Sequence, residues 1–332
     1  YTTLFRSSPV GVSVAVDASF VIKLEANGLF MLRFSRVLRG QVKIQMKSLF
    51  RRSPSSHQVG ILLASDRILL ACVDPVPVFA SQPVNGPHDW SKALAELFSR
   101  HGLAKSKVRV ALAASLYQQI QIDKPAVPDA EMAGALPWAI KDFVNEPVLQ
   151  LAMDYVDLPT PPAGRPRINV VCMPKSRVQQ VADAVNGAAT LEAIVSDELA
   201  MTALYEADQM VRMLLWQPRG QELQLLVFHR GGLCFSRQLR GFASLTGSHE
   251  PDADQLDALA LEIQRSIDYL AGHLKLPEPG QLQLAIASSA MGVLVRHLEQ
   301  TFGFPVSAMA NKAVLAGVEY LSAYGAALGR SD

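Results

Sequence analysis

Cysteine is scarce in this sequence, with only three among 332 residues. Cys72, Cys172 and Cys234 lie far apart among apolar neighbours, and no two have the Cys-x-x-Cys spacing of a zinc ligand pair. Such an odd, widely spaced set predicts neither a disulfide framework nor a metal site. We therefore expect three buried, reduced thiols and a reducing compartment.

An excess of charge of either sign is also missing. The sequence has 31 Lys and Arg against 30 Asp and Glu, and aromatic residues make up 7% of it. A protein drawn to nucleic acid by electrostatics normally presents a basic face. The composition therefore argues against nucleic acid as a partner.

Long hydrophobic runs are absent too. A membrane-spanning helix needs about 20 consecutive apolar residues, whereas the most apolar stretch, residues 68–80, is interrupted by Asp74, Pro75 and Pro77. The N-terminus lacks the ordered basic, apolar and small-residue regions of a secretory signal. We expect a soluble protein, or one that touches a membrane only from the side.

What the sequence does contain is material for a large core. Hydrophobic residues make up 49% of the chain and charged residues 18%, which excludes a disordered polypeptide. The length predicts two domains or one large bilobed domain.

The first 45 residues differ from the rest, with no capped helix and no clear pair of strands. Residues 1–7 resemble the translation of a common sequencing-library adapter, and residues 46–52 look like a natural start. We expect residues 1–45 to be a non-native extension made of translated adapter and upstream DNA. The alternative is a genuine extension in which residues 11–22 alternate weakly like a strand.

The pattern from residue 58 predicts an α/β unit. Two β-rich runs, 58–64 and 68–73, flank a short turn and predict a hairpin, with a third strand over 76–84. Asp89 caps a helix with apolar residues at helical spacing, and strands follow over 107–114 and 117–122. Strands followed by a helix and further strands are typical of an α/β domain. Next we expect a helix to about residue 144, strands over 148–158 and 168–173, a helix over 176–185, a strand over 191–195 and a helix over 196–207.

The second half repeats this theme. Residues 211–216, 221–228 and 233–239 predict a three-stranded meander. A long amphipathic helix over 254–274, a strand over 281–287, a helix over 293–302, a short strand at 306–307 and a terminal helix over 319–328 follow. Two halves with one pattern predict a duplicated α/β architecture with a cleft between lobes.

With these segments in place, the chain resembles the PilM family of type IV pilus assembly proteins, and within it the MshI-type members of the mannose-sensitive haemagglutinin (MSHA) pilus system. The resemblance covers most of residues 46–330. It rests on the basic start, both meanders, the segment Val127-Pro128-Asp129-Ala130-Glu131 through Leu136-Pro137-Trp138-Ala139-Ile140, and the terminal Tyr320-Leu321-Ser322-Ala323-Tyr324-Gly325. It implies an actin-like (ribonuclease-H-like, duplicated) bilobed ATPase fold with a PilM-type inserted subdomain. The expected parts are lobe I over 46–195, including the subdomain at about 117–190, lobe II over 196–318, and a terminal helix over 319–332 that returns to lobe I.

In relatives with this fold, two hairpins face each other across the cleft and an Asp on each holds hydrated Mg²⁺ or the attacking water. The family pattern at the first hairpin is Gly-Ile-Asp-Ile-Gly-Ser, and here it is Gly60-Ile61-Leu62-Leu63-Ala64-Ser65. Gly60 and Ser65 match, but Leu62 takes the carboxylate position. The second hairpin should read Asp-Ile-Gly, and the alignment places Gln217-Pro218-Arg219-Gly220 there.

The loop on the nucleoside side is weakened as well, because Ser288 and Ser289 replace a Gly-Gly pair. The resemblance leaves Gly60, Ser65, Gly220, Ser288 and Ser289 as a degenerate nucleotide cleft. With both carboxylates replaced, we expect a pseudo-ATPase with no catalytic residues. ATP, bound weakly or not at all, is the only cofactor expected, and no metal is expected without it. The seven histidines show no metal-binding spacing.

The resemblance also implies a groove for a partner. PilM-like proteins hold the short cytoplasmic N-terminal peptide of a PilN-like bitopic inner-membrane protein, and an extended peptide can add to a strand edge with its apolar side chains in pockets. Trp138, Phe143, Met153 and Tyr155 are the candidate contacts; the alternative for Trp138 and Phe143 is burial in the core. A pilus assembly motor ATPase is a further expected partner.

The preferred hypothesis is a cytoplasmic scaffold of an MSHA-type pilus platform, held peripherally at the inner membrane. One alternative is a working actin-like ATPase or sugar-kinase-type phosphotransferase, for which Asp66 is the acidic residue nearest the first hairpin. The other is the cytoplasmic domain of a type II secretion L-like protein, which would continue into a transmembrane helix.

Overall fold

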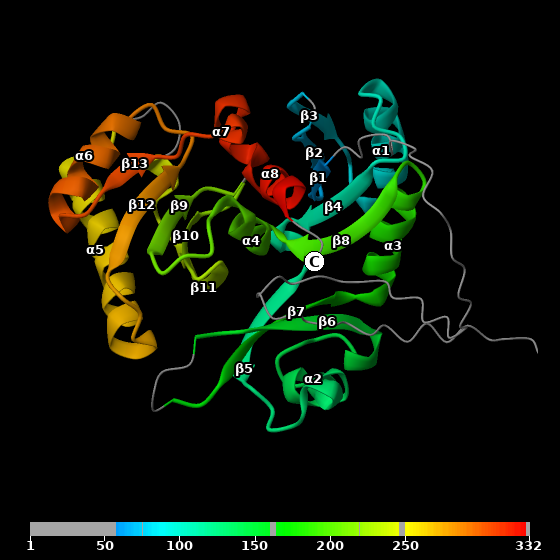
Figure 1. Ribbon diagram of the computed structural model, residues 1–332, viewed down its shortest axis with the longest axis horizontal. Helices are drawn as coiled ribbons and strands as arrows, with labels where there is room; N and C mark the ends of the chain where they lie inside the picture. The colour runs from blue at the N-terminus through cyan, green and yellow to red at the C-terminus, as the bar shows by residue number, and fades with distance from the viewer. Residues whose placement is uncertain (1–57, 75, 160–163, 219, 246–249, 330–332) are drawn as a thin grey trace, which may run out of the picture.

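The computed structural model describes residues 58–74, 76–159, 164–218, 220–245 and 250–329. The predicted extension, residues 1–45, and the basic segment 46–52 lie outside these ranges. The described residues form three sheets, two with five strands and one with three (Figure 1).

Lobe I is built on the first five-stranded sheet, in the order β3-β2-β1-β4-β8. Its strands are β1 (Gln58–Leu63), β2 (Arg67–Cys72), β3 (Val78–Pro83), β4 (Lys107–Leu112) and β8 (Thr190–Ser196). The first three strands form an antiparallel meander, and β4 and β8 run parallel to β1. The predicted hairpin at residues 58–73 is therefore confirmed.

Lobe II repeats this arrangement in the order β11-β10-β9-β12-β13. Its strands are β9 (Val211–Trp216), β10 (Leu223–His229), β11 (Gly232–Leu239), β12 (Pro279–Ala285) and β13 (Val306–Ala308). Here too the first three strands form an antiparallel meander and the next two are parallel to the first of them. Since strand order and direction agree, the repeat predicted from the sequence is a repeat of topology.

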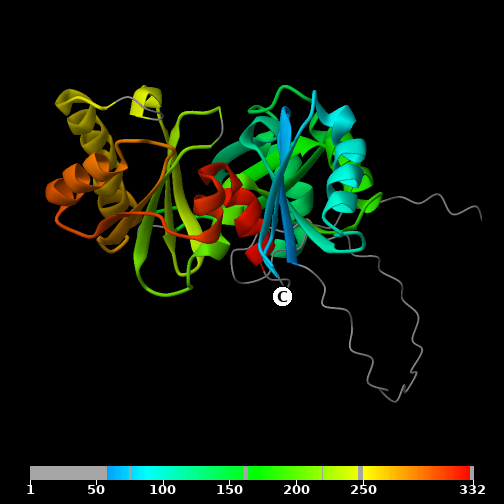
Figure 2. The same ribbon diagram turned by 90° about the horizontal axis from the view of Figure 1, so that it is seen from above.

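Helices cover both faces of the lobe I sheet. One face packs on α1 (Trp90–Arg100) and α3 (Lys175–Asn186), where Trp90, Leu94, Leu97 and Phe98 are buried at the predicted helical spacing. The other face packs on α8 (Leu321–Leu328), which returns from lobe II together with α7 (Lys312–Ala316), both red in Figure 2. Lobe II has its core between its sheet and the helices α5 (Ala253–Tyr269) and α6 (Met291–Phe302).

The three-stranded sheet lies below lobe I in Figure 1, between β4 and β8 in the sequence. Its order is β5 (Gln118–Asp123), β7 (Arg167–Pro174), β6 (Leu151–Asp157), all antiparallel. Helix α2 (Met132–Ile140) covers its outer face with a small core of its own. The inner face turns toward the two lobes, which makes the junction between them the place where a site can form.

The connection between lobes I and II is short. Ser196 ends β8 and caps α4 (Asp197–Ala200), since its hydroxyl accepts the N–H of Leu199 at 3.3 Å. The expected helix over 196–207 is wrong in length: a 3₁₀ turn, Met201–Leu204, follows α4, and the backbone is extended at Tyr205. Within the described residues, no helix combines the length and apolar character needed to cross a membrane.

Candidate functional site

A cavity lies where the first hairpin of lobe I, the start of α4 and the β9–β10 hairpin of lobe II meet. Its volume is about 30 Å³, room for no more than one or two water molecules. Its walls are Leu62, Ala64, Asp66, Arg67, Leu69, Ala113, Asp197, Trp216, Pro218, Gln221 and Glu319. This interlobe cavity lies between the two hairpins that the sequence analysis expects to face each other.

Leu62 and Trp216 line this cavity from the two hairpins. Along β9, Leu214 and Trp216 pack toward lobe I while Met213 and Leu215 pack into the core of lobe II. Alternation therefore turns Trp216, not Gln217, into the cavity. The backbone N–H of Gln217 instead donates to the carbonyl of Ala285, at 3.2 Å.

The five residues expected to form the cleft do not meet in this cavity. Ser65 and Gly220 are exposed turn residues, and Gly220 has a φ of 67° that favours glycine. Ser289 is exposed, and the hydroxyl of Ser288 accepts the N–H of Ala290 at 3.2 Å ahead of α6. None of these four lines the cavity, nor does Gly60.

Position 60 requires a glycine for a different reason, the packing of a helix. A Cβ added there would lie 2.0 Å from the carbonyl oxygen of Ala323 and 2.3 Å from the nitrogen of Ala327. The glycine therefore allows α8 to lie directly against β1. Its match to the family pattern reflects helix packing in this chain.

Two acidic residues at the lobe junction are buried: Asp197 is 2% exposed and Glu198 is 4% exposed. Asp197 accepts the Tyr117 hydroxyl at 2.8 Å and the N–H of Ala114 at 3.3 Å. Glu198 accepts the Ser236 hydroxyl of lobe II at 2.9 Å and the Gln119 amide of the three-stranded sheet at 3.4 Å. This pair connects lobe I, lobe II and the three-stranded sheet.

Burial controls the protonation of these groups. It raises the pKa of Asp197 to about 7, with the neighbouring charge of Glu198 adding to the effect. The pKa of Glu198 is also raised by burial, against the lowering effect of its bonds to Ser236 and Gln119. Burial, with the charge of Asp197, raises the pKa of Tyr117 well above its usual value. Asp197 therefore titrates near neutral pH.

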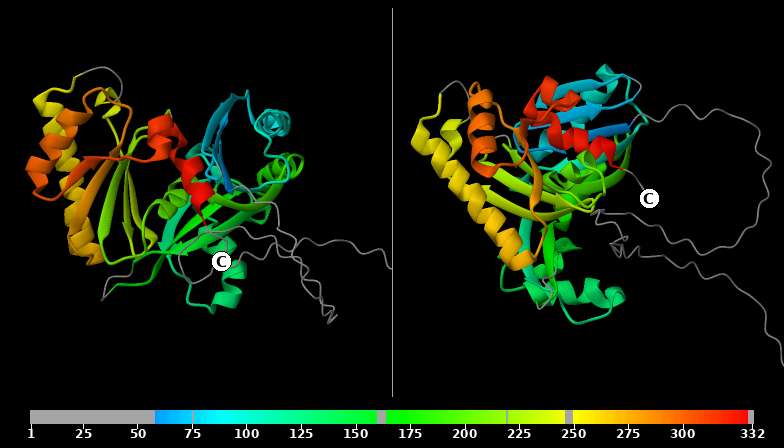
Figure 3. Two further views of the ribbon diagram at one scale, coloured as in Figure 1. Left: turned by 45° about the horizontal axis from the view of Figure 1, so that its top comes forward. Right: turned by 60° about the vertical axis from the view of Figure 1, so that its left-hand side comes forward.

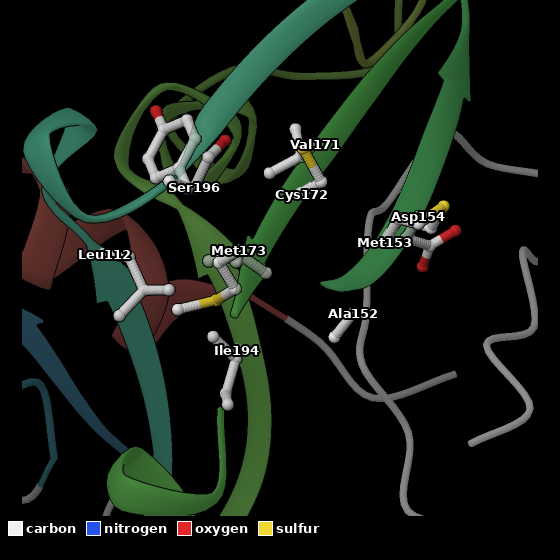
Figure 4. A pocket seen from close by; sticks show the side chains of 11 residues that line it. Leu112, Ala152, Met153, Asp154, Val171, Cys172, Met173, Ile194 and Ser196 are labelled. Carbon is white, nitrogen blue, oxygen red and sulfur yellow. The ribbon is translucent and has the colours of Figure 1, made fainter. Parts of the chain in front are cut away.

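The inner face of the three-stranded sheet forms a second candidate site, the sheet groove. We define it by alternate residues on β6 and β7, namely Ala152, Asp154, Val156, Asn169, Val171 and Met173. At one end of this face, a narrow apolar pocket of about 20 Å³ lies between the three-stranded sheet and Leu112 of β4 and Ile194 of β8 (Figure 4). At the other end of the face, a separate polar hollow of about 280 Å³ lies against Leu199, Leu233, Phe235 and Ser236.

Asp154 stands in the narrow end and is 3% exposed. Its Oδ1 accepts the backbone N–H of Tyr155 at 2.8 Å, while Oδ2 has no hydrogen-bond partner among the described residues. Burial raises the pKa of this carboxyl to about 7. On the same face Asn169 is 7% exposed, and its Oδ1 likewise has no partner in the described part of the chain.

The four expected partner contacts lie on or under the outer face instead. Trp138 and Phe143 are 71% and 62% exposed, so the alternative that they belong to the core is wrong. Tyr155 is buried in the core beneath α2, and partly buried Met153 packs against the same core. Met153 also reaches the edge of the narrow pocket. The structure thus does not gather the four residues into one groove.

The sequence analysis missed Asp154, Asp197 and Glu198 as site residues. The last two directly follow an apolar strand, and the carboxyl ends of parallel strands are where sites form in α/β sheets. Their position after a strand could therefore have identified them as candidates. Nothing in the sequence indicated Asp154 in this way, because a single acid in an alternating strand normally faces solvent.

Solved structures with a similar architecture are known. The chain is similar to one from the PilM–PilN type IV pilus biogenesis complex, with 19% identity and a TM-score of 0.58 over 81% of this chain and 97% of that one. This chain shares the fold of that chain. The actin-like bilobed fold with an inserted subdomain, predicted from the sequence, is therefore confirmed. All three cysteines are free and buried, as predicted.

Two other solved structures are also similar. The cytoplasmic domain of EpsL, an inner-membrane component of the type II secretion system of Vibrio cholerae, matches with 16% identity and a TM-score of 0.47 over 82% of this chain and 96% of that one. A Bacteroides thetaiotaomicron protein with an actin-like ATPase fold matches with 13% identity and a TM-score of 0.46 over 80% and 95%. No family model and no curated protein matches the sequence.

The interlobe cavity does not fit a magnesium nucleotide. Leu62 and Trp216 line it with apolar side chains from the two hairpins, and neither supplies an oxygen for a metal-bound water. The cavity, with a volume of about 30 Å³, is also far too small to hold a nucleotide. We therefore derive no chemistry through ATP.

Proposed function

We propose that the protein is a PilM-like scaffold of a type IV pilus assembly platform. In this role it binds the N-terminal cytoplasmic peptide of a PilN-like single-span inner-membrane protein. The observation that supports the proposal most is the sheet groove, a sheet face with an apolar pocket at one end and a polar hollow at the other, in a fold that matches 97% of a chain from a PilM–PilN complex. An extended peptide suits a groove of this form.

The finer parts of the proposal follow from the resemblance. The protein would act in an MSHA-type system, on the cytoplasmic side of the inner membrane, recruited there by its partner. The junction at Asp197 and Glu198, shared by both lobes and the three-stranded sheet, would couple the peptide site to the state of an assembly motor ATPase.

We further propose that this scaffold does not hydrolyse ATP. Leu62 and Trp216 support this, since they line the interlobe cavity with apolar groups from both hairpins. The test is a titration of the full chain with ATP, with and without Mg²⁺, together with an assay for phosphate release. Turnover that disappears in an Asp66→Ala or Asp197→Asn variant would instead establish a working ATPase.

Two observations make the alternative, a working ATPase, worth testing. Asp66 and Asp197 both line the cavity, and the indole N–H of Trp216, buried beside them, has no hydrogen-bond partner within the described residues. A Trp216→Phe variant removes this donor while keeping most of the side-chain volume. Under the scaffold proposal it leaves peptide binding unchanged.

The docking proposal is tested by isothermal titration of the full chain with the synthetic N-terminal peptide of the PilN-like partner. In an Ala152→Phe variant a ring fills the groove, and we expect peptide affinity to fall at least about tenfold. Trp138→Ala changes an exposed aromatic on the other face of the subdomain and serves as the matched comparison. If Trp138→Ala abolishes binding and Ala152→Phe does not, the peptide binds over α2. No binding to the wild-type chain would refute the proposal.

The remaining alternative, a type II secretion L-like protein, is addressed by co-purification. Recovery of the chain from its native host with type II secretion components, and without pilus components, would favour that role.

A further inference from the structure

The sheet groove contains a carboxylate oxygen that the protein itself leaves unpaired. Asp154 is almost fully buried, and within the described residues its Oδ2 accepts no hydrogen bond. A buried carboxylate oxygen that accepts no hydrogen bond lowers the stability of the fold, because it loses hydration without a compensating donor. Such a residue in the wall of a groove points to a donor supplied by a ligand.

The surroundings of Asp154 narrow the identity of that donor. The pocket that Asp154 lines is otherwise mainly apolar, with Ala152 and Val171 on the same sheet and Leu112 and Ile194 across from them (Figure 4). Two residues along β7 from Val171, Asn169 offers a second unpaired acceptor, Oδ1. The same face of the sheet therefore presents two acceptors, one in the apolar pocket and one in the polar hollow. A ligand that fits must donate hydrogen bonds and must also bring apolar surface.

The dimensions point to a thin side chain. The narrow end leaves little free space, but one of its walls is the unbranched side chain of Met173, which repacks readily around an inserted group. Lysine and arginine combine a slender aliphatic stem with a charged donor tip, so the stem lies along apolar walls while the tip reaches an acid. A metal ion fits poorly, because no group of three acidic, histidine or cysteine side chains gathers here or elsewhere in the described residues.

We propose that Asp154, assisted by Asn169, recognises a lysine or arginine side chain of an extended peptide whose apolar neighbours lie in the sheet groove. This inference rests on the proposed function in taking the ligand to be a peptide, and it adds the side-chain chemistry by which the peptide is recognised. The physical basis of this recognition is charge complementarity, because a buried acid pairs with a basic side chain of the partner.

The test does not depend on knowing the partner. A displayed library of random nonapeptides is selected on the wild-type full chain, and the bound pool is counter-selected on Asp154→Asn. We expect the selected peptides to share one Lys or Arg flanked by apolar residues. A synthetic peptide of that sequence should bind Asp154→Asn at least about tenfold more weakly than wild type. Replacing its basic residue by Gln should cost the same factor in wild type and nothing further in Asp154→Asn.

A second measurement uses the chain alone. If Asp154 serves recognition, Asp154→Leu should melt at a temperature equal to or higher than wild type, since an uncompensated acid is removed. Ala152→Phe, which fills the groove and keeps the acid, should abolish binding of the selected peptides.

Several outcomes would overturn the inference. These are selected peptides without a basic residue, equal binding by Asp154→Asn and wild type, or a large fall in melting temperature in both Asp154 variants, which would make the acid structural. Failure of the PilN-like peptide alone, with basic peptides still selected at Asp154, would refute the proposed pilus role and leave the recognition site standing.

Discussion

The phenolic oxygen of Tyr117 lies 2.8 Å from Oδ1 of Asp197 and donates a hydrogen bond to it. Tyr117 stands where the chain leaves lobe I for the three-stranded sheet, and Asp197 where it leaves lobe I for lobe II. One buried hydrogen bond thus joins the two segments through which the chain leaves lobe I. We expect this bond to help hold lobe I, lobe II and the three-stranded sheet together.

Removing this bond should destabilise the protein. In Tyr117→Phe a buried carboxyl loses a donor, and we expect the free energy of unfolding to fall by about 1–3 kcal/mol. Urea unfolding followed by far-UV circular dichroism measures the change. Tyr205→Phe is the matched control, because the hydroxyl of Tyr205 is buried without a partner among the described residues and its removal should cost little. Equal losses in the two variants would contradict the role of the Tyr117 bond.

The bond from lobe II should matter less but in the same direction. Ser236→Ala deletes the donor that Glu198 receives from β11, and we expect a loss of about 1 kcal/mol. Ser322→Ala provides the comparison, since Ser322 is fully buried in α8 and its hydroxyl has no partner in the described residues. That variant should be neutral or slightly stabilising. The prediction is wrong if Ser322→Ala is the more damaging change.

Stability should decrease as the pH rises from about 4 to about 7. Asp154 has a pKa of about 7 in the folded protein, against about 3.9 for an unfolded aspartate, so between these values the folded state binds more protons than the unfolded state. The contribution of this group to the free energy of unfolding is therefore largest below the unfolded pKa. It decreases as the pH rises and is lost above the folded pKa. Asp197 contributes with the same sign.

Asp154→Asn removes one of these contributions. We expect the decrease between about pH 4.5 and about pH 7.5 to shrink by on the order of 2 kcal/mol, measured by urea unfolding at intervals of pH. Ala152→Val, on the same face of β6 and without a charge, controls for altered packing. A pH dependence in Asp154→Asn identical to that of wild type would exclude the carboxyl as its source.

Two glycine substitutions should have opposite effects. Gly60→Ala places a Cβ against the backbone of α8, which must move, and we expect a loss of more than about 3 kcal/mol. Gly134→Ala lies in α2 with nothing within 4 Å of the added Cβ, and it should stabilise the chain by about 0.5–1 kcal/mol. Thermal unfolding of both variants decides the matter. A tolerated Gly60→Ala would mean that α8 does not rest on β1.

The fold was largely accessible from the sequence because its signals are local. Strict alternation in residues 107–112 predicted β4, and helical spacing from Trp90 to Phe98 predicted the buried face of α1. The two meanders each carry turn residues at their ends. Periodicity could not show the short α7, or the break after α4, since these follow from contacts with distant elements.

The sites were less accessible, for a physical reason. Asp197 and Glu198 look like a solvated first turn of a helix, and only Tyr117, Gln119 and Ser236, far away in the sequence, bury and pair them. Trp216 was overlooked because the turn was aligned by residue type, whereas the pleat of β9 decides which side chain enters the cavity. Gly60 matched a phosphate-binding pattern, yet its neighbour is a helix.

The contact between β1 and α8 also affects how the chain folds as it is made. The first described strand of lobe I is completed by a helix at the far end of the described chain, visible in Figure 3 as the red segment beside the blue strands. The face of the lobe I sheet that packs on α8 therefore cannot be covered while the ribosome is still translating lobe II, unlike domains that fold one after another as they emerge. Contacts so distant in sequence also slow folding, because a long loop must close before they form. During synthesis the apolar face of β1, β2 and β4 stays uncovered, and we expect the nascent chain to need protection by chaperones until α8 is released.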